Sequence, residues 1–187
     1  SNYPLELQHQ LISAWAVAST KEFPSRKDES WRWMDFKELD LESLELNAKN
    51  SPIRLDVRHV HEDEEHRLVT TPLPKGVVVT TLKQLFASKS GLAVKLLADH
   101  STVSEDLFEA LPSALANDGL VVYVPRGVIV KGVVQCFLNV SLDNQAAFTR
   151  NLIWLEDDTK IKLELVWVND FIAQSGLHNG ILQVNLG

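Results

Sequence analysis

Residues Leu120–Val124 have the sequence Leu-Val-Val-Tyr-Val and run directly into the turn Pro125-Arg126-Gly127. β-Branched and aromatic residues favour extended backbone, and proline and glycine close together end a strand. From this point to residue 187, short runs of strand-forming residues alternate with polar turns. A doubly wound sheet needs helices between its strands, and no helical pattern separates these runs. This part of the sequence therefore favours a sandwich, a barrel or a β-solenoid.

The run at residues 160–168 has the clearest two-residue alternation. Ile161, Leu163 and Leu165 fall on one side of an extended chain, and Lys162 and Glu164 fall on the other. We therefore expect the three aliphatic side chains to face the core. Further strands are predicted at residues 128–130, 133–140, 147–155 and 181–186.

The chain before Gly119 is more highly charged and its pattern is typical of helices. An amphipathic helix with one apolar face is predicted by the helical spacing of Leu7, Leu11, Trp15 and Ala18. Ser25 followed by Asp28 predicts a second helix start, and Asp35 followed by Glu38 a third.

Two more helices are predicted closer to the strand region. Thr80 or Thr81 is placed to cap the first, and a short strand is expected just before it. The second begins after Ser104, is kinked or limited by Pro112, and is stopped by Gly119. We therefore predict an α+β fold, with a mainly α-helical N-terminal domain over residues 1–118 and a β domain over residues 119–187.

Composition limits the classes of protein that fit. The 187 residues carry 18 Lys and Arg against 25 Asp and Glu, and this formal charge of -7 disfavours a nucleic-acid-binding protein. No apolar run approaches the ~18 residues of a membrane span, and no basic start precedes an apolar segment. The single cysteine, Cys136, cannot form an internal disulfide, which favours a reducing compartment.

The histidine-rich stretch from His59 to His66 raises the question of a metal site. Its sequence is His-Val-His-Glu-Asp-Glu-Glu-His, and His61 and His66 are one residue too far apart for the zinc-binding pattern H-E-x-x-H. His59 and His61 can face the same way on a strand and chelate a metal. Runs of charge are more often exposed, so we favour a solvated acidic loop over a metal site.

The other candidates for chemistry have simpler interpretations. Cys136 lies in an apolar run that lacks a histidine or cation to activate it, so a core thiol is expected. Asp157-Asp158 and Asp143 fall in turn-like sequence rather than in the paired arrangement of a glycosidase. The five tryptophans are expected to anchor the core rather than to stack sugars or bases. They are Trp15, Trp31, Trp33, Trp154 and Trp167. We assign no catalytic, cofactor-binding or metal-binding residue.

Several segments resemble one protein family. Residues 24–35, Pro-Ser-Arg-Lys-Asp-Glu-Ser-Trp-Arg-Trp-Met-Asp, are similar to a signature near the start of the SufD branch of the SufB/SufD family. This family belongs to the SUF iron–sulfur cluster assembly machinery. Residues 114–128 resemble the family's entry to its β domain, Asp-Gly followed by a strand and Val-Pro-x-Gly-Val, and residues 149–155 resemble its Pro-Arg strand. Shorter similarities are Leu-Pro-Lys-Gly-Val at residues 73–77 and Leu-Phe-Glu-Ala-Leu at residues 107–111.

The sequence departs from the family pattern in places. Met34 stands where threonine is usual, Lys131-Gly132 replaces Lys-Pro, and Thr149 replaces the proline before Arg150. Family members are also about twice as long. The family residues tied to cluster assembly lie in the part that has no counterpart here, so none is placed on this sequence.

The resemblance implies a fold and a function. The fold is the first coils of a right-handed β-helix, truncated at its C-terminal end, and the function is that of a non-enzymatic scaffold subunit. In the full-length family complex the partners are SufB and SufC, and the cofactors are an iron–sulfur cluster and ATP on SufC, with a flavin as a further candidate. No cofactor is expected on this segment itself. The expected location is the cytoplasm, or the plastid stroma in a plant or alga.

Two further expectations remain open. The alternative function is a small β-helix or cupin-like carbohydrate-active enzyme, which needs carboxylates or histidines converging on one strand face. The last predicted strand, residues 181–186, leaves backbone donors and acceptors unpaired at an apolar edge. We therefore expect self-association through that open β-helix end.

Overall fold

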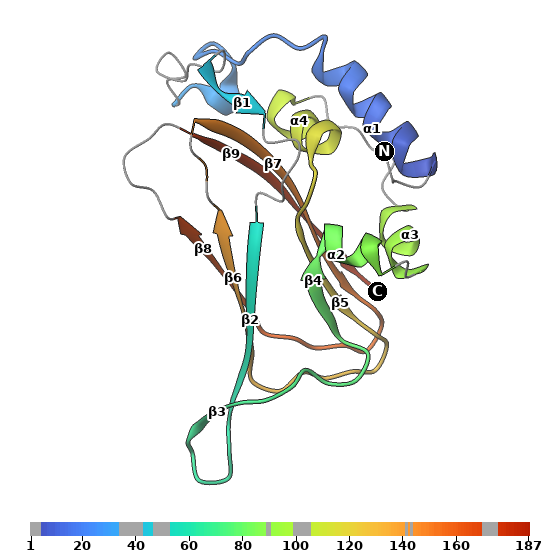
Figure 1. Ribbon diagram of the computed structural model, residues 1–187, viewed down its shortest axis with the longest axis vertical. Helices are drawn as coiled ribbons and strands as arrows, with labels where there is room; N and C mark the ends of the chain where they lie inside the picture. Colours follow the sequence, from blue (N-terminus) through green and yellow to red (C-terminus); the bar gives the residue numbers. More distant parts are fainter. Residues whose placement is uncertain are drawn as a thin grey trace.

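The computed structural model describes residues 5–33, 43–46, 53–88, 91–98, 106–140, 142, 144–169 and 176–187. Within these residues the protein is a mixed α/β structure of two β-sheets and a small number of helices. Figure 1 shows the four α-helices gathered on the side of one sheet, and a long β-hairpin projecting from the lower end of the molecule.

The helices are α1 (Leu5–Ala18), α2 (Leu82–Ala87), α3 (Gly91–Ala98) and α4 (Leu107–Leu115), with a short 3-10 turn, η1 (Glu29–Trp31). One sheet, called sheet A, contains β1 (Glu45–Leu46), β4 (Val78–Thr81), β5 (Leu120–Val124), β7 (Gln145–Leu155) and β9 (Leu177–Leu186). The other, called sheet B, contains β2 (Ile53–Glu62), β3 (Leu68–Thr70), β6 (Val133–Val140) and β8 (Leu163–Asn169). The predicted strands at 120–124 and 133–140 are confirmed.

The strands after Gly119 stack in parallel with a constant step along the sequence. In sheet A, Val122 of β5 pairs with Ile153 of β7, which pairs with Val184 of β9, so each step advances the chain by 31 residues. In sheet B, β6 and β8 are also parallel. Successive strands therefore alternate between the sheets, as the coils of a solenoid do. A closed solenoid is not shown, so the β-helix remains a prediction.

The segment before Gly119 forms one end of this stack. β4 pairs antiparallel with β5 in sheet A, and β2 pairs antiparallel with β6 in sheet B. We call this the capped end. Because β2 alone is 10 residues long, the predicted mainly helical character of residues 1–118 is not confirmed. At the other end β8 and β9 are the outermost strands among the described residues, and we call this the open end.

The main core lies between the two sheets. Alternate residues of β5 and of β6 point into it, and these side chains are almost completely buried. Ile161, Leu163 and Leu165 pack against the same cluster, which confirms their predicted facing. Burial of aliphatic side chains between two sheets is the main stabilising term of such a fold. The fully buried members include Leu120, Val122, Val124, Val134, Cys136 and Leu138.

A second apolar cluster joins the helices to the outer face of sheet A. Leu85 of α2 and Leu96 of α3 pack there against Val121 and Leu152. Helix α2 starts where the sequence predicts, because Thr81 caps it by accepting a hydrogen bond from the backbone of Gln84 at 3.2 Å. Helix α3, by contrast, was not predicted from the sequence.

Helix α4 is tied to β9 through its internal proline. Pro112 has no N–H, so it cannot bond to the carbonyl of Phe108 one turn earlier. The side chain of Asn179 on β9 donates to that carbonyl instead, at 3.0 Å. The helix continues to Leu115, so the proline does not end it as predicted, and a strand residue satisfies the acceptor that the proline leaves.

Helix α1 forms as predicted, and of its predicted apolar side chains Leu11 and Ala18 are packed but Trp15 is not. Ala14 and Ala18 are buried, whereas Trp15 is 51% exposed. The small alanines allow the close packing of α1 on α4, so the large ring is turned outward. The second predicted helix start, at Ser25, corresponds only to the short turn η1. The predicted start at Asp35 lies outside the described residues.

Candidate interaction surface

The open end exposes the inner face of sheet A. Side chains directly opposite in a parallel ladder point to the same side of the sheet, so Val184 and Leu186 of β9 share the inner face with Ile153 and Leu155 of β7. On β5 the inner side chains are 0% exposed, but on β9 Val184 is 50% and Leu186 is 74% exposed. The apolar face therefore continues beyond the point where it is covered.

Sheet B ends in the same way. Leu163, Leu165 and Trp167 of β8 lie opposite Val134, Cys136 and Leu138 of β6. The three β6 side chains are fully buried, whereas Trp167 is 46% exposed. Both sheets thus finish in an uncovered apolar edge on the same, inward-facing side.

The outer face of β9 differs from its inner face in the polarity of its side chains. Val121 and Leu152 are covered by helices, and the next member of that ladder is Gln183. Tyr123 and Trp154 are likewise followed by Asn185. Toward the C-terminal end of β9 the outer side chains are therefore polar, whereas Leu182, Val184 and Leu186 on its inner side are aliphatic.

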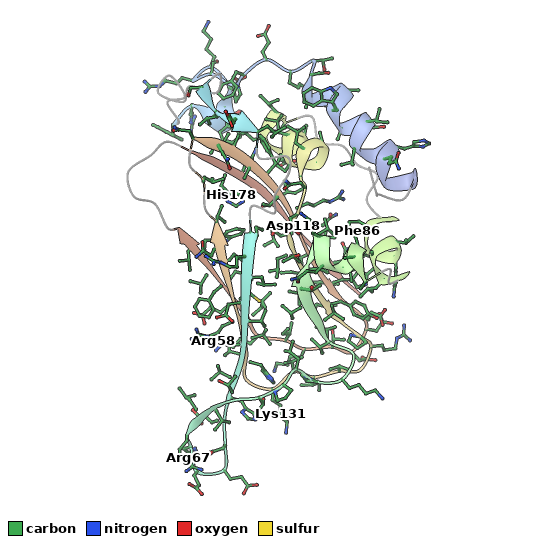
Figure 2. All side chains as sticks on the ribbon, viewed as in Figure 1. Arg58, Arg67, Phe86, Asp118, Lys131 and His178 are labelled. Carbon is green, nitrogen blue, oxygen red and sulfur yellow. The ribbon has the colours of Figure 1, made fainter. Side chains whose placement is uncertain are left out.

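A polar network lies on the inner side of β7 and β9. Asn151 accepts a hydrogen bond from the backbone of Leu120 at 2.9 Å and donates to the carbonyl of Ile181 at 3.0 Å. The hydroxyl of Thr149 lies 2.9 Å from Nε2 of His178, whose ring centre is 4.9 Å from that of Trp167. Burial lowers the pKa of His178. These contacts fix the register of β9 near its start, at His178, which is labelled in Figure 2.

Arg150 lies on the outer side of β7 and is 7% exposed. Its Nε is completely buried and has no hydrogen-bond partner among the residues that the structure describes. Burial lowers the pKa of this guanidinium, since water is withdrawn from the charge. The charge therefore carries a desolvation cost that no described ion pair offsets.

Glu156 links the end of β7 to helix α3. Its carboxylate pairs with Lys95 and accepts hydrogen bonds from the Tyr123 hydroxyl and the Arg126 backbone, each at 3.0 Å. The hydrogen bond from Lys95, followed by the backbone bond from Arg126, lowers the pKa of Glu156 to about 2. The site holds the helix against the sheet.

The histidine-rich stretch is not the loop that was predicted. His59 and His61 belong to β2, and His59 is buried, with Nε2 donating to the carbonyl of Lys131 at 2.7 Å. The carbonyl of Pro72 and the hydroxyl of Thr71 each lie 3.2 Å from its Nδ1. The two-residue period places His59 on the core side, and the apolar alternation of β2 extends further than its charged residues suggested.

The rest of that stretch is a tight turn between β2 and β3. Asp63 accepts backbone hydrogen bonds from Glu65 and Arg67, which lower its pKa, and His66 adopts a φ of 59°. Arg67 marks the tip of the projecting hairpin, and Lys131 lies near its base (Figure 2). In the described ranges, no group of three potential ligands is placed to hold a metal ion.

The turn at Lys131-Gly132 explains one departure from the family pattern. Gly132 has a φ of 78°, which proline cannot adopt. A Cβ at this position would lie 2.3 Å from the carbonyl oxygen of Val60. Glycine is therefore required where the family usually has proline, because the turn passes directly over β2.

The remaining candidate residues are the single cysteine and three aspartates. Cys136 is a buried core thiol, and burial raises its pKa to about 11. Asp157 and Asp158 lie in a turn, with Asp157 paired to Arg126 and Asp158 at a φ of 58°. Asp143 lies outside the described residues.

The prediction that the tryptophans anchor the core is wrong for three of them. Trp15, Trp33 and Trp167 are 51%, 84% and 46% exposed, and Trp31 and Trp154 are only partly buried. A large ring with one polar N–H often sits at the margin of a core, and Trp31 donates to Asp106 at 2.9 Å. Residue type alone did not reveal this placement.

The geometry defines a stack of paired strands with one capped end and one apolar open end. Residues 61–136, from β2 to β6, match the family model for the SufBD protein N-terminal region. A curated relative, "Iron-sulfur cluster assembly protein SufB" of Bacillus subtilis (strain 168), is 25% identical over 81 residues. That stretch is 43% of this chain and 17% of the relative's length. The two matches support the SufB/SufD family for this chain, and they do not distinguish SufD from SufB.

No helix in the described parts of the chain is long and apolar enough to cross a membrane.

Proposed function

We propose that this chain is a scaffold subunit of an iron–sulfur cluster assembly complex, of the SufD-like branch, and that it does not act as an enzyme. The observation that carries the proposal is the match of residues 61–136 to the SufBD N-terminal region, which gives the class of assembly. The apolar inner faces of β8 and β9 provide shape and contact area for that assembly.

The finer parts of the proposal rest on the sequence resemblance. The SufD-like branch is favoured by the signature at residues 24–35 and by the entry to the β domain at residues 114–128. The parallel strands, with their constant step of 31 residues, support the start of a right-handed β-helix. We propose a cytoplasmic location and no cofactor on this segment. The cluster, and ATP on SufC, belong to the complex as a whole.

The proposed partners are SufB and SufC of the source organism. Tagged chain co-expressed with both is expected to retain them through affinity purification and gel filtration. Leu186→Lys places a charge on the open end, and Leu68→Lys changes an equally exposed leucine on the hairpin, at 74% and 75% exposure. The first variant is expected to weaken retention and the second to leave it unchanged. No retention of either partner by the wild-type chain would refute the proposal.

A further inference from the structure

A pocket lies between the segment that follows α1 and the start of α4. Its volume is about 710 Å³, which falls within the usual range of ligand-binding pockets. Residues 21–25 and 27–31 line it together with Asp106 and Leu107. In Figure 1 this segment leaves the upper end of α1 and runs above α4. It includes most of the signature at residues 24–35, to which neither the core nor the proposed function gives a role.

Two aromatic rings form part of the lining, and contacts with α4 hold both in place. Phe23 and Trp31 each pack against Phe108, with ring centres 5.5 and 4.9 Å from that of Phe108. The indole N–H of Trp31 donates to Asp106 at 2.9 Å, and Asp106 also caps α4 by accepting from the backbone of Phe108 at 2.8 Å. Because the N–H is already used, the indole offers a ligand its π-face, which attracts cations.

The charged side chains of the lining are mainly acidic. Four carboxylates and two lysines line the pocket, an excess of two negative charges. Two of the carboxylates shape it, since Asp106 caps α4 and Asp28 accepts hydrogen bonds from the backbone and hydroxyl of Ser25 at 2.7 and 3.1 Å. The side chains of the other two, Glu22 and Glu29, have no hydrogen-bond or ion-pair partner in the described part of the chain. The pocket therefore combines held aromatic rings with two available carboxylates.

This combination selects a cation rather than an anion. An anion meets the negative excess of the lining and the formal charge of -7 of the whole chain, and both attract a cation. A metal ion fits poorly, because no group of three potential metal ligands occurs among the described residues. The arginine guanidinium fits well, since it is planar, stacks on aromatic rings and pairs with a carboxylate through two hydrogen bonds.

From these observations we propose that the pocket binds a peptide segment of a partner protein through an arginine side chain. The guanidinium stacks on Phe23 or Trp31 and pairs with Glu22 or Glu29. A volume of this size accommodates more than one side chain, so residues beside the arginine also contact the lining. The inference goes beyond the proposed function and does not rest on it, because it involves neither β8 nor β9.

The first test compares two unlabelled peptides by isothermal titration calorimetry with the purified chain. The basic probe is Gly-Arg-Leu-Arg-Gly amide and the acidic probe is Gly-Glu-Leu-Glu-Gly amide. The basic probe is expected to bind saturably with one peptide per chain, and the acidic probe about tenfold more weakly or not at all. Equal binding of the two probes, or no saturable binding of the basic probe, overturns the proposal.

The second test separates a specific site from attraction to net charge. Glu22→Gln combined with Glu29→Gln should weaken binding of the basic probe by about fivefold or more. The matched control is Glu64→Gln combined with Glu65→Gln, which removes the same charge from the tip of the hairpin and should leave binding unchanged. All four side chains are exposed, so neither pair is expected to affect folding. Equal weakening by both pairs overturns the proposal.

The third test concerns the aromatic rings and the position of the peptide. Phe23→Leu keeps an apolar side chain but removes a π-face, so it should weaken binding of the basic probe by about threefold. Phe137→Leu makes the same change on the outer face of β6 and should leave binding unchanged. A photo-cross-linking residue in place of the leucine of the basic probe should label residues 20–33 or 106–108, as read by mass spectrometry. Labels elsewhere on the chain, or equal effects of the two leucine variants, overturn the proposal.

Discussion

The capped and open ends of the stack are built from different kinds of strand. At the capped end, β2 and β4 run antiparallel to their neighbours, and β2 carries charges on its outer face. At the open end, β8 and β9 repeat the parallel register of the coils before them, and β9 is uncharged. Antiparallel pairing and charge end a stack, whereas parallel pairing with an aliphatic inner face continues it. The difference separates a charged, antiparallel cap from coils that repeat one parallel register.

The largest expected effect is a loss of stability that decreases from the buried inner leucine of β6 to the exposed inner leucine of β9. Leu138→Ala, at a fully buried position of β6, should cost about 2–5 kcal/mol because it leaves a cavity between the sheets. Leu163→Ala on β8 should fall at the lower part of that range, and Leu182→Ala, at 51% exposure, should cost less than about 1 kcal/mol. Urea unfolding of the three variants measures the series. Equal losses at Leu138 and Leu182 would mean that the open end is covered.

A second comparison sets a buried cation against an exposed one. Arg150→Met removes a desolvated charge and keeps apolar volume, so we expect stability to rise by about 1 kcal/mol or more. Arg58→Met, at a side chain 58% exposed, should change it by less than about 0.5 kcal/mol. Thermal and urea unfolding of both variants decides the matter. A loss of stability in Arg150→Met would show that the guanidinium has a counter-charge in solution.

The link between α4 and the open strand gives a smaller effect. Asn179→Ala should cost about 1 kcal/mol, because the carbonyl of Phe108 loses its donor. In a Pro112→Ala background the alanine N–H supplies that carbonyl, so the same Asn179→Ala change should cost less. A double-mutant cycle in urea isolates this coupling from the packing lost at Pro112. Additive losses would contradict the role given to the proline.

The smallest effect concerns acid stability on the covered face. The folded-state pKa of Glu156, about 2, lies below its ordinary value of 4.5, so ionisation favours the folded state. This contribution is fully present above the ordinary pKa and is lost as the pH falls toward 2. Lys95→Met removes the largest cause of the shift. The stability difference between wild type and this variant should therefore shrink from pH 6 to pH 3, as followed by urea unfolding.

Sequence patterns predicted the strands better than they predicted their environment. The two-residue period identified β5, β6 and the inner side of β8, because alternation directly reports a half-buried strand. At His59 to His66 we favoured an acidic loop instead, because the charged residues concealed that His59 and His61 lie in the strand β2. The role of His59 depends on Lys131 and Pro72, which are distant in sequence, so no local pattern reveals it.

The candidate surface was foreseen only in outline. An apolar edge at residues 181–186 was expected, but the exposure of Trp167 was not. Its burial depends on whether another strand lies beside β8, and composition does not report that. Residue type alone also misplaced Trp15, since the packing of α1 is set by Ala14 and Ala18 rather than by its largest side chain.

The order of the cap and the coils along the chain has a consequence during protein synthesis. β2 and β4 leave the ribosome before β5 and β6. The antiparallel partner of β5 and that of β6 are therefore synthesised before the strands with which they pair. Every later strand then has a preceding edge of fixed register to join, and the nascent protein can lengthen by one coil at a time. Addition of each strand to an edge that has already formed reduces the number of alternative strand pairings that the chain can sample.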